Sequence, residues 1–359
     1  MTSMSVRDVL IIGAGPSGLS AAIAAKRREL DYQVLEQGTL VDSIYRFPPQ
    51  MVFFTTPELL EIGGLPFVSP YDKPTRAEAL RYYRRVVDTF DLQIAFEEKV
   101  LSVAREEGAS AAGEGRMAAD DGDPLFAVET RSSRGVRRVR HARHVVLATG
   151  YFDHPNRLNV PGEDLPHVHH YYSEPHPYYR RRVVIVGGGN SAAEWALELF
   201  RAGAHVTLVH RRPELKSTIK YWVRPDIENR IKEGSIAARF NSCVREIRRT
   251  SVRVAAIGAV DGGPGVGEDE LAADAVFLLV GYHADWDLQA RAGVDMNDRR
   301  APILDPATFE TSVPGLFIAG GALAGMDTGN IFIENGRFHG EKIVEVIAER
   351  VNGRSGDLI

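Results

Sequence analysis

A glycine-rich pattern occurs twice in this chain of 359 residues, and it limits the possible folds more than any other feature. The first copy, GAGPSG, begins at Gly13, and the second, GGGNSA, begins at Gly187, 174 residues later. Each copy follows a short apolar run and precedes an alanine-rich or amphipathic stretch. This strand, turn and helix context is the one in which such loops bind dinucleotides. Two copies predict two Rossmann-like domains.

Each small residue of the pattern has its own physical task. The first glycine makes a tight turn, the second lets a pyrophosphate approach, and the third small residue lets helix and strand pack closely. The N-terminus of the following helix stabilises the phosphate charge. The candidate turn residues are Gly13, Gly15, Pro16, Ser17 and Gly18 in the first copy, and Gly187, Gly189, Asn190, Ser191 and Ala192 in the second.

The two units differ in charge at the end of the next strand. The strand YQVLE ends in Glu36, whose carboxylate can bind the two hydroxyls of an adenosine ribose. The matching place in the second unit carries His210, Arg211 and Arg212, which suit a 2′-phosphate. Lys216 either reaches that phosphate or is an ordinary surface lysine. The sequence therefore predicts FAD at the first site and NADPH at the second.

The connecting segments predict a split domain. The strand HVVLATG ends at Gly150 and returns the chain to the first site, whereas AVFLLVGY closes the second unit. Residues 108–124 are expected to be the tip of a β-hairpin. The predicted fold is α/β, with two Rossmann-like dinucleotide-binding domains of the three-layer ββα type. The FAD domain spans 1–157 and 285–359, and the NADPH domain, 158–284, is inserted between them.

Composition excludes several classes of function. A net charge of −5, from 43 basic and 48 acidic residues, gives no polybasic surface for nucleic acid. No apolar run approaches membrane-spanning length and no signal peptide is evident, so a cytoplasmic protein is expected. Cys243 is the single cysteine, interpreted as a buried structural thiol, so a dithiol is impossible. No metal is expected: the histidines of the Pro- and Tyr-rich linker are interpreted as solvated or packed at a hinge, and they are His167, His169, His170 and His176.

The order GAGPSG, ATG, GGGNSA, HRR and GLFIAGG resembles the low-molecular-weight thioredoxin reductase type of flavoprotein over nearly the whole chain. Within it, the stretches SIYRFPPQMVFFTTPELLEIGGLPF, IKYW, PDIENRIKEG and NIFIENGRFHG look like the bacillithiol disulfide reductase (YpdA-type) family. The resemblance implies FAD and NADPH as cofactors and a homodimer or homotetramer.

Four positions depart from these families. Thioredoxin reductases carry CxxC where this chain has His170 and Ser173, and the YpdA-type relatives typically place a cysteine where it has Ser17. A serine cannot form a mixed disulfide, so Ser17 is expected only to cap the helix or to hydrogen-bond the cofactor. Gly321 stands where thioredoxin reductases usually have an aspartate that touches the flavin ribityl and phosphate region. Either the amides of Gly320 and Gly321 replace it, or the contact is lost.

The resemblance also implies further contacts. A helix starting near Asn330 is expected to direct its N-terminus at the flavin pyrimidine. Tyr45, Phe53 and Phe54 either flank the isoalloxazine or pack in the core. The remaining candidates for FAD are Gln37, Thr149, Gly150, Gly320, Gly321, Asn330 and Ile331, and Gly281 is a further candidate for NADPH.

The predicted reaction transfers hydride from NADPH to flavin N5 and then to a low-molecular-weight disulfide such as bacillithiol disulfide. No side chain is a clear acid, base or nucleophile, so the cofactor supplies the chemistry. Other electron acceptors stay open: the alternatives are a ferredoxin- or quinone-type NADPH reductase, a flavin monooxygenase, and a redox-sensing flavoprotein with slow turnover.

Overall fold

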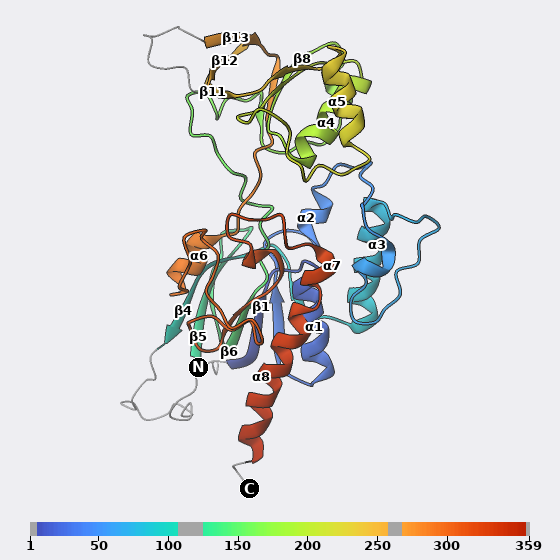
Figure 1. Cartoon of the computed structure of the whole chain (residues 1–359). Helices are drawn as coiled ribbons and strands as arrows, with labels where there is room; N and C mark the ends of the chain where they lie inside the picture. The colour runs from blue at the N-terminus through green and yellow to red at the C-terminus, as the bar shows by residue number, and fades with distance from the viewer. Residues whose placement is uncertain (1–5, 107–124, 258–267, 357–359) are drawn as a thin grey trace. The chain divides into compact units, whose positions relative to one another are not determined.

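The structure, a computed structural model, describes residues 6–106, 125–257 and 268–356, and the chain forms two compact units (Figure 1). Unit 1 comprises Met1–His154 and Tyr282–Ile359, and unit 2 comprises Pro155–Gly281. Each junction lies three residues before the predicted boundary. The shift has a physical reason, because the Asn156 amide donates to the Gly281 carbonyl, 2.9 Å away, and so joins both ends of unit 2.

Unit 1 is built on a seven-stranded sheet in the order β3-β2-β1-β6-β5-β4, with β15 also paired to β6. Strands β1, β2, β3, β6 and β15 run parallel, and β4 and β5 continue the sheet as an antiparallel hairpin. The strands are β1 (Val6–Ile12), β2 (Tyr32–Leu35), β3 (Ile94–Ala95), β4 (Glu98–Glu106), β5 (Leu125–Ser132), β6 (Arg137–Leu147) and β15 (Leu316–Ile318). The predicted hairpin tip, 108–124, lies outside the described residues.

Helices cover one face of this sheet, and α1 and α8 lie side by side on it (Figure 1). Glycines permit close approach to α1: a Cβ built on Gly340 of α8 would lie 2.3 Å from the Ala21 amide nitrogen, and one on Gly336 of α7 would lie 3.2 Å from Ser17 Oγ. The helices are α1 (Pro16–Arg27), α2 (Asp42–Tyr45), α3 (Arg76–Phe90), α6 (Trp286–Arg291), α7 (Ile333–Gly336) and α8 (His339–Gly356), with 3-10 turns η1 (Pro57–Leu60) and η3 (Gly320–Leu323).

Unit 2 contains a parallel five-stranded sheet in the order β10-β9-β8-β14-β7 and an antiparallel sheet of β11, β12 and β13. The strands are β7 (Val168–His169), β8 (Arg182–Val186), β9 (His205–Val209), β10 (Ala237–Arg239), β11 (Ser242–Ile247), β12 (Ser251–Ala256), β13 (Glu268–Ala272) and β14 (Ala275–Leu278). The helices are α4 (Asn190–Arg201) and α5 (Arg224–Lys232), with the 3-10 turn η2 (His176–Tyr178).

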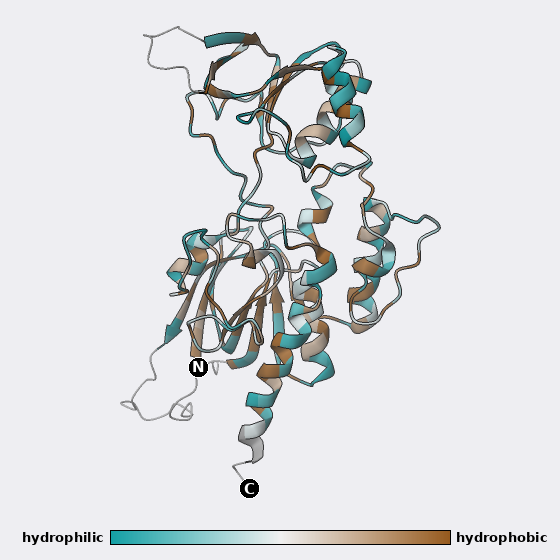
Figure 2. Ribbon diagram, viewed as in Figure 1, coloured by the Kyte–Doolittle hydropathy of each residue, from teal (hydrophilic) through white to brown (hydrophobic). Residues whose placement is uncertain are grey.

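Alternation along β8 shows how unit 2 forms three layers. Val183 and Ile185 point into a core shared with α4 and α5, whereas Val184 and Val186 pack against the three-stranded sheet. A strand segment buried on both faces must be apolar at every position, which the four residues after the exposed Arg182, Val183–Val186, satisfy. Figure 2 shows hydrophobic strands within each unit. The predicted α/β class with two Rossmann-like domains is confirmed.

Two local expectations need adjustment. The last part of the chain was expected to form one helix beginning near Asn330, but it forms α7 and α8, separated by Arg337 and Phe338. Cys243 lies in β11 as expected, but it is only partly buried, with Sγ 3.7 Å from the Ala255 carbonyl oxygen. In the described part of the chain, no helix is long and apolar enough to cross a bilayer.

Candidate functional site

The first glycine turn shows the predicted division of labour. Gly13 has φ +111°, and a Cβ there would lie 2.4 Å from the Ala148 carbonyl oxygen. A Cβ on Gly18 would lie 1.9 Å from the Gly13 carbonyl oxygen. Around Gly15, in contrast, no described atom comes within 4 Å of the Cβ position. The turn is therefore closed where the backbone must pack and open at the start of α1, where a pyrophosphate fits.

Glu36 lies directly after β2 and is almost fully buried. Its carboxylate accepts hydrogen bonds from the Ala14 and Gly38 amides, both at 2.8 Å, one on each oxygen. Burial raises the pKa of Glu36, and these two amide bonds oppose the rise. Each oxygen retains a second acceptor position, so the carboxylate can still accept hydrogen bonds from two ribose hydroxyls.

Ser17 contacts another segment of unit 1. Its hydroxyl donates to the Gly336 carbonyl at 3.0 Å, and it lies 2.3 Å from the position of a Cβ on Gly320. The expectation that Ser17 caps the helix is wrong: α1 has its N-cap at Gly15, without a side-chain cap bond. Ser17 lies inside the first turn, and its Oγ finds an acceptor on α7 instead.

The amide of Gly320 is also already engaged. It donates to Nδ1 of His339, 3.1 Å away, at the start of α8. Of the two outcomes expected here, loss of the contact is favoured for the Gly320 amide, because its one N–H already has an acceptor. Burial, followed by the charge of Lys342, lowers the pKa of His339 to about 4, which keeps Nδ1 able to accept.

This pKa predicts a pH effect on stability. Since the folded-state pKa lies below the ordinary value of 6.5, His339 contributes stability that is complete above about pH 6.5 and is lost as the pH falls toward 4. We expect His339→Asn, whose side-chain oxygen can accept from Gly320, to fall less in melting temperature over this range than wild type. Thermal unfolding between pH 7.5 and 4.5 measures the difference, and identical slopes would contradict the assignment.

The expected helix at Asn330 is absent. Asn330 is exposed, and its carbonyl accepts from the Asn335 side chain at 2.9 Å, while the same side chain accepts from the Phe332 amide. This bonding turns the chain into α7, which begins only at Ile333 and has four residues. Asn330 and Ile331 therefore lie in a turn, so the predicted helix dipole is not available there.

The other FAD candidates are also residues of unit 1. The Gln37 side chain donates to Asp153 at 2.8 Å, and Gly150, with φ +68°, has no described atom within 4 Å of its Cβ position. Thr149 is half-buried between Ala148 and Gly150. Tyr45 is 53% exposed, with the Arg76 guanidinium 5.4 Å from its ring centroid, so core packing does not explain it.

The two adjacent phenylalanines have different surroundings. Phe53 is buried in the core, whereas Phe54 is 38% exposed and meets Phe332 edge to face at 6.0 Å. The sequence did not indicate Phe332 as a neighbour of Phe54, although Phe332 lies in the stretch NIFIENGRFHG that resembles the YpdA-type family. Its partner is far away in sequence, and no local pattern indicates such a pair.

The second glycine turn repeats the plan of the first. Gly187 has φ +154°, and a Cβ there would lie 2.5 Å from the Leu279 carbonyl oxygen and 3.0 Å from Ala192 Cβ. A Cβ on Gly188 would collide with the His210 ring, 2.3 Å away. Around Gly189, Lys216 Cδ is the one described atom within 4 Å of the Cβ position, at 3.8 Å. This turn is open at the same place as the first.

His210 belongs to the floor of this turn rather than to its surface. It is buried, and burial, then the charges of Lys216, Arg211 and Arg212, lower its pKa. Asn190 is also engaged: its side chain accepts from the Lys220 amide at 2.9 Å and donates to the Thr218 carbonyl at 3.2 Å. Both residues therefore shape the turn.

Arg211 and Arg212 are both exposed directly after His210. Among the described residues, neither guanidinium forms an ion pair, whereas most other arginines of unit 2 have carboxylate partners. Two neighbouring guanidiniums without carboxylate partners suit an anionic ligand.

The remaining NADPH candidates are also residues of unit 2. Ser191 is exposed in the first turn of α4, and the Lys216 amide donates to the Gly188 carbonyl at 2.9 Å. Gly281, with φ +98°, lies against Asn156.

Two of the linker histidines lie against neighbours, whereas His176 is exposed. His167 Nε2 lies 3.0 Å from the Arg248 carbonyl oxygen, and the His169 ring lies 5.2 Å from that of Phe277. Tyr172, between the two positions of the missing CxxC, stacks on Trp195 at 4.5 Å. Within the described ranges, no group of three or more metal-ligating side chains comes together. Aromatic packing occupies this segment.

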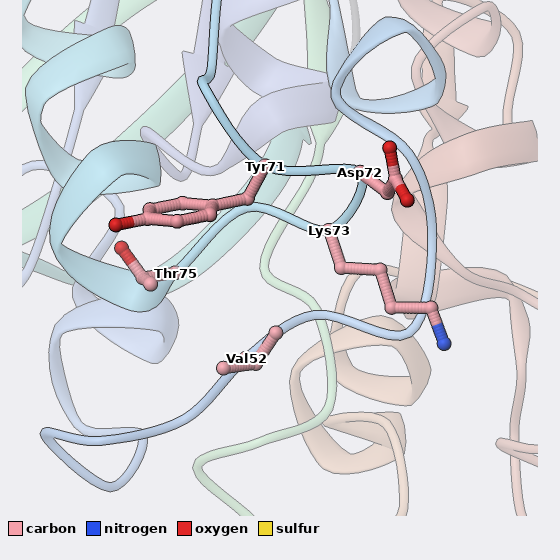
Figure 3. A pocket seen from close by; sticks show the side chains of 5 residues that line it. All are labelled: Val52, Tyr71, Asp72, Lys73 and Thr75. Atoms are coloured by element: carbon pink, nitrogen blue, oxygen red, sulfur yellow. The ribbon is translucent and has the colours of Figure 1, made fainter.

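Unit 1 also has an open surface cavity of about 510 Å³, apart from the glycine turn. It is lined by Val52, Tyr71, Asp72, Lys73 and Thr75 (Figure 3). The hydroxyls of Tyr71 and Thr75 point toward each other, while the Lys73 ammonium points away from them. None of the predicted cofactor residues lines this cavity.

Two Rossmann-like units, one with a buried carboxylate and the other with two unpaired arginines after the second strand, define a flavin- and pyridine-nucleotide-dependent oxidoreductase. Comparison with known proteins agrees. The profile of the pyridine nucleotide-disulphide oxidoreductase family matches residues 10–111 and 118–320. The chain belongs to this family, and its cofactors are FAD and NADPH.

Individual relatives differ in how similar they are to this chain. Bacilliredoxin reductase Bdr of Bacillus subtilis is 39% identical over 97% of this chain and 100% of its own length. The solved bacillithiol disulfide reductase Bdr (YpdA) from Bacillus cereus has a TM-score of 0.87 and 37% identity, covering 96% of this chain and 100% of its own. A ferredoxin–NADP reductase of Ignicoccus hospitalis is 26% identical over 88% of this chain and 90% of its own length. The ferredoxin-type alternative is therefore not favoured.

Proposed function

We propose that this protein uses NADPH, through FAD, to reduce a low-molecular-weight disulfide such as bacillithiol disulfide. The balanced reaction consumes NADPH, one proton and one disulfide, and it yields NADP⁺ and two thiols. The observation that carries the proposal is the pair of glycine turns. The first is open at Gly15 and the second at Gly189, and each is followed by side chains whose charge suits its nucleotide. The identity to bacilliredoxin reductase Bdr supports a disulfide as the oxidant.

The residues present fit both cofactors. FAD would be held at Gly13, Gly15 and Gly18, with Glu36 accepting from its ribose, and NADPH at Gly187 and Gly189, with Arg211 and Arg212 on its 2′-phosphate. The other proposed contacts with FAD are Pro16, Ser17, Gln37, Tyr45, Thr149, Gly150, Gly320, Gly321, Asn330 and Ile331, and with NADPH they are Asn190, Ser191, Ala192, His210, Lys216 and Gly281. When bound, the cofactors supply hydride transfer from the nicotinamide through flavin N5 to the disulfide.

The chain's own contribution is position and electrostatics rather than a nucleophile. Cys243 is the single cysteine of the sequence, in a strand of unit 2, and it cannot form an internal dithiol. The hydroxyl of Ser17 is already committed as a donor to Gly336. The disulfide would therefore be reduced without a covalent bond to the protein.

One experiment tests the proposal directly. The purified flavoprotein is reduced anaerobically with NADPH and separately with NADH, and bacillithiol disulfide is then added while the flavin absorbance is followed. We expect faster reduction by NADPH and return of the oxidised spectrum within seconds. A flavin that stays reduced would contradict the proposal. Rapid oxidation by a ferredoxin or quinone, or a long-lived oxygen adduct, would indicate a rival function.

Ser17 provides a second prediction. We expect Ser17→Ala to keep disulfide reduction within about threefold of wild type and to lose about 1 kcal/mol of unfolding free energy, because only the hydrogen bond to Gly336 is removed. Steady-state rates and urea unfolding measure the two effects. Ser17→Cys is the matched control that restores the family's thiol. A loss of activity above 100-fold in Ser17→Ala alone would show that the hydroxyl takes part in the chemistry.

We also propose a cytoplasmic homodimer or homotetramer. NADPH-driven thiol production belongs to a compartment that keeps thiols reduced, which supports the location. The assembly rests on the resemblance to thioredoxin reductases. Light scattering coupled to size-exclusion chromatography would give the mass, and a monomer of 39.5 kDa at micromolar concentration would contradict it.

A further inference from the structure

A tyrosine that the sequence patterns do not single out lies at the predicted flavin site. Tyr151 follows Gly150 at the end of the β6 segment, and its ring packs on the backbone of Gly321. A Cβ built on Gly321 would lie 2.7 Å from Tyr151 Cδ1 and 3.0 Å from its Cε1. Carbon atoms that are not bonded do not approach so closely. Any side chain at position 321 and the Tyr151 ring in this position exclude each other.

Other parts of unit 1 lie close to Tyr151. The Tyr151 carbonyl accepts from the His154 amide at 3.2 Å, and the Tyr282 ring lies 6.5 Å away, centroid to centroid. The Cα of Gly150 would itself lie 3.4 Å from a Cβ on Gly321. The two Tyr151 atoms that would collide with a Cβ at position 321, Cδ1 and Cε1, belong to a rigid ring. They are not the end of a flexible side chain, so a small rotation cannot relieve the clash.

The polar end of Tyr151 is a donor without an acceptor. Burial, followed by the charge of Glu334, raises the pKa of Tyr151, so the phenol stays protonated and neutral. Among the described residues, its hydroxyl makes no hydrogen bond. A neutral donor differs from a carboxylate at the same site, because it can donate to a phosphate or ribityl oxygen without adding negative charge.

Gly321 and Tyr151 are both close in sequence to residues that contact the first glycine turn. Gly321 follows Gly320, which lies against Ser17, and Tyr151 is three residues after Ala148, whose carbonyl lies against Gly13. Thioredoxin reductases usually place at position 321 an aspartate that touches the ribityl and phosphate region of the flavin. Here the phenol ring occupies the space which that side chain would need.

We propose that Tyr151 is a flavin-positioning residue that, as a matched pair with Gly321, replaces the acidic side chain of thioredoxin reductases with a neutral hydrogen-bond donor. The proposal rests on the proposed function, because it assumes FAD at the first glycine turn. It also explains why this chain has glycine at position 321.

A double-mutant cycle tests the steric part. Apo protein is prepared for wild type, Gly321→Ala, Tyr151→Ala and the double variant, and FAD affinity is measured by quenching of flavin fluorescence. We expect Gly321→Ala to lower the affinity at least about tenfold in the wild-type background and by less than about twofold in the Tyr151→Ala background. Equal effects in both backgrounds would overturn the pairing. If Gly321→Ala alone does not fold, folding of the double variant supports the pairing, and its failure overturns it.

Tyr151→Phe tests the hydroxyl. We expect about a tenfold loss of FAD affinity with an unchanged melting temperature of the apo protein, because the hydroxyl has no protein partner to lose. A purely structural role would change the melting temperature and leave the affinity. Wild-type affinity in Tyr151→Phe would overturn the donor role. NADP⁺ binding should stay constant throughout, since no changed residue lies in unit 2, and wild-type protein without any affinity for FAD would instead refute the proposed function.

Discussion

Replacing Arg211 and Arg212 together by alanine is expected to abolish the preference for NADPH over NADH. Both guanidiniums are exposed at the end of β9, and neither has a carboxylate partner in the described part of unit 2. Each can form charge-assisted hydrogen bonds to a 2′-phosphate, which are the stronger kind. The NADPH concentration for half-maximal flavin reduction should rise about 100-fold, while that for NADH should change less than about threefold.

The measurement is stopped-flow reduction of the flavin over a range of each nucleotide. Arg224 is the matched control, because it is an arginine of the same unit that is already paired with Glu228 at 2.7 Å. Arg224→Ala should leave the preference unchanged. Equal weakening of NADPH and NADH in the double variant would mean that the arginines contact the pyrophosphate or the nicotinamide half. No weakening at all would move the 2′-phosphate to another cation, with Lys216 the first to examine.

The parts of the site that the sequence could predict are those fixed by neighbours along the chain. The turn at Gly13 needs a strand before it and a helix after it, and the sequence shows both within 20 residues. Glu36 follows the same logic, since parallel strands β1 and β2 bring their ends together. These features are local, so spacing and residue type are sufficient to infer them.

Other contacts could not be predicted, because they join distant segments. Ser17 and Gly336 are 319 residues apart, and the acceptor is a backbone carbonyl, which carries no sequence signal. His339 competes for the Gly320 amide that the sequence analysis assigned to the cofactor. For a related reason, the helix expected to begin near Asn330 begins only at Ile333. A side-chain amide, Asn335, forms an alternative bond with the backbone, and propensity alone does not reveal which bond wins.

The same substitution should affect stability very differently at two glycines of the first turn. Gly18→Ala should lower the unfolding free energy of the apo protein by about 3 kcal/mol or more, because its Cβ would lie 1.9 Å from the Gly13 carbonyl oxygen and backbone cannot yield easily. Gly15→Ala should change it by less than about 1 kcal/mol, since φ is −77° and nothing lies within 4 Å. Urea unfolding of both apo variants measures the difference.

Binding of FAD should show the complementary pattern. In Gly15→Ala, the new methyl group enters the open space at the start of α1, so FAD affinity should fall about 10- to 100-fold in a protein that is otherwise stable. The matching variant of unit 2, Gly189→Ala, should leave FAD affinity unchanged and weaken both NADPH and NADH, because a pyrophosphate is common to the two. If Gly15→Ala bound FAD as wild type does, the open space would not be the path of the pyrophosphate. Gly15 would then have only a conformational role in the turn, and the assignment of FAD to this turn would lose its steric support.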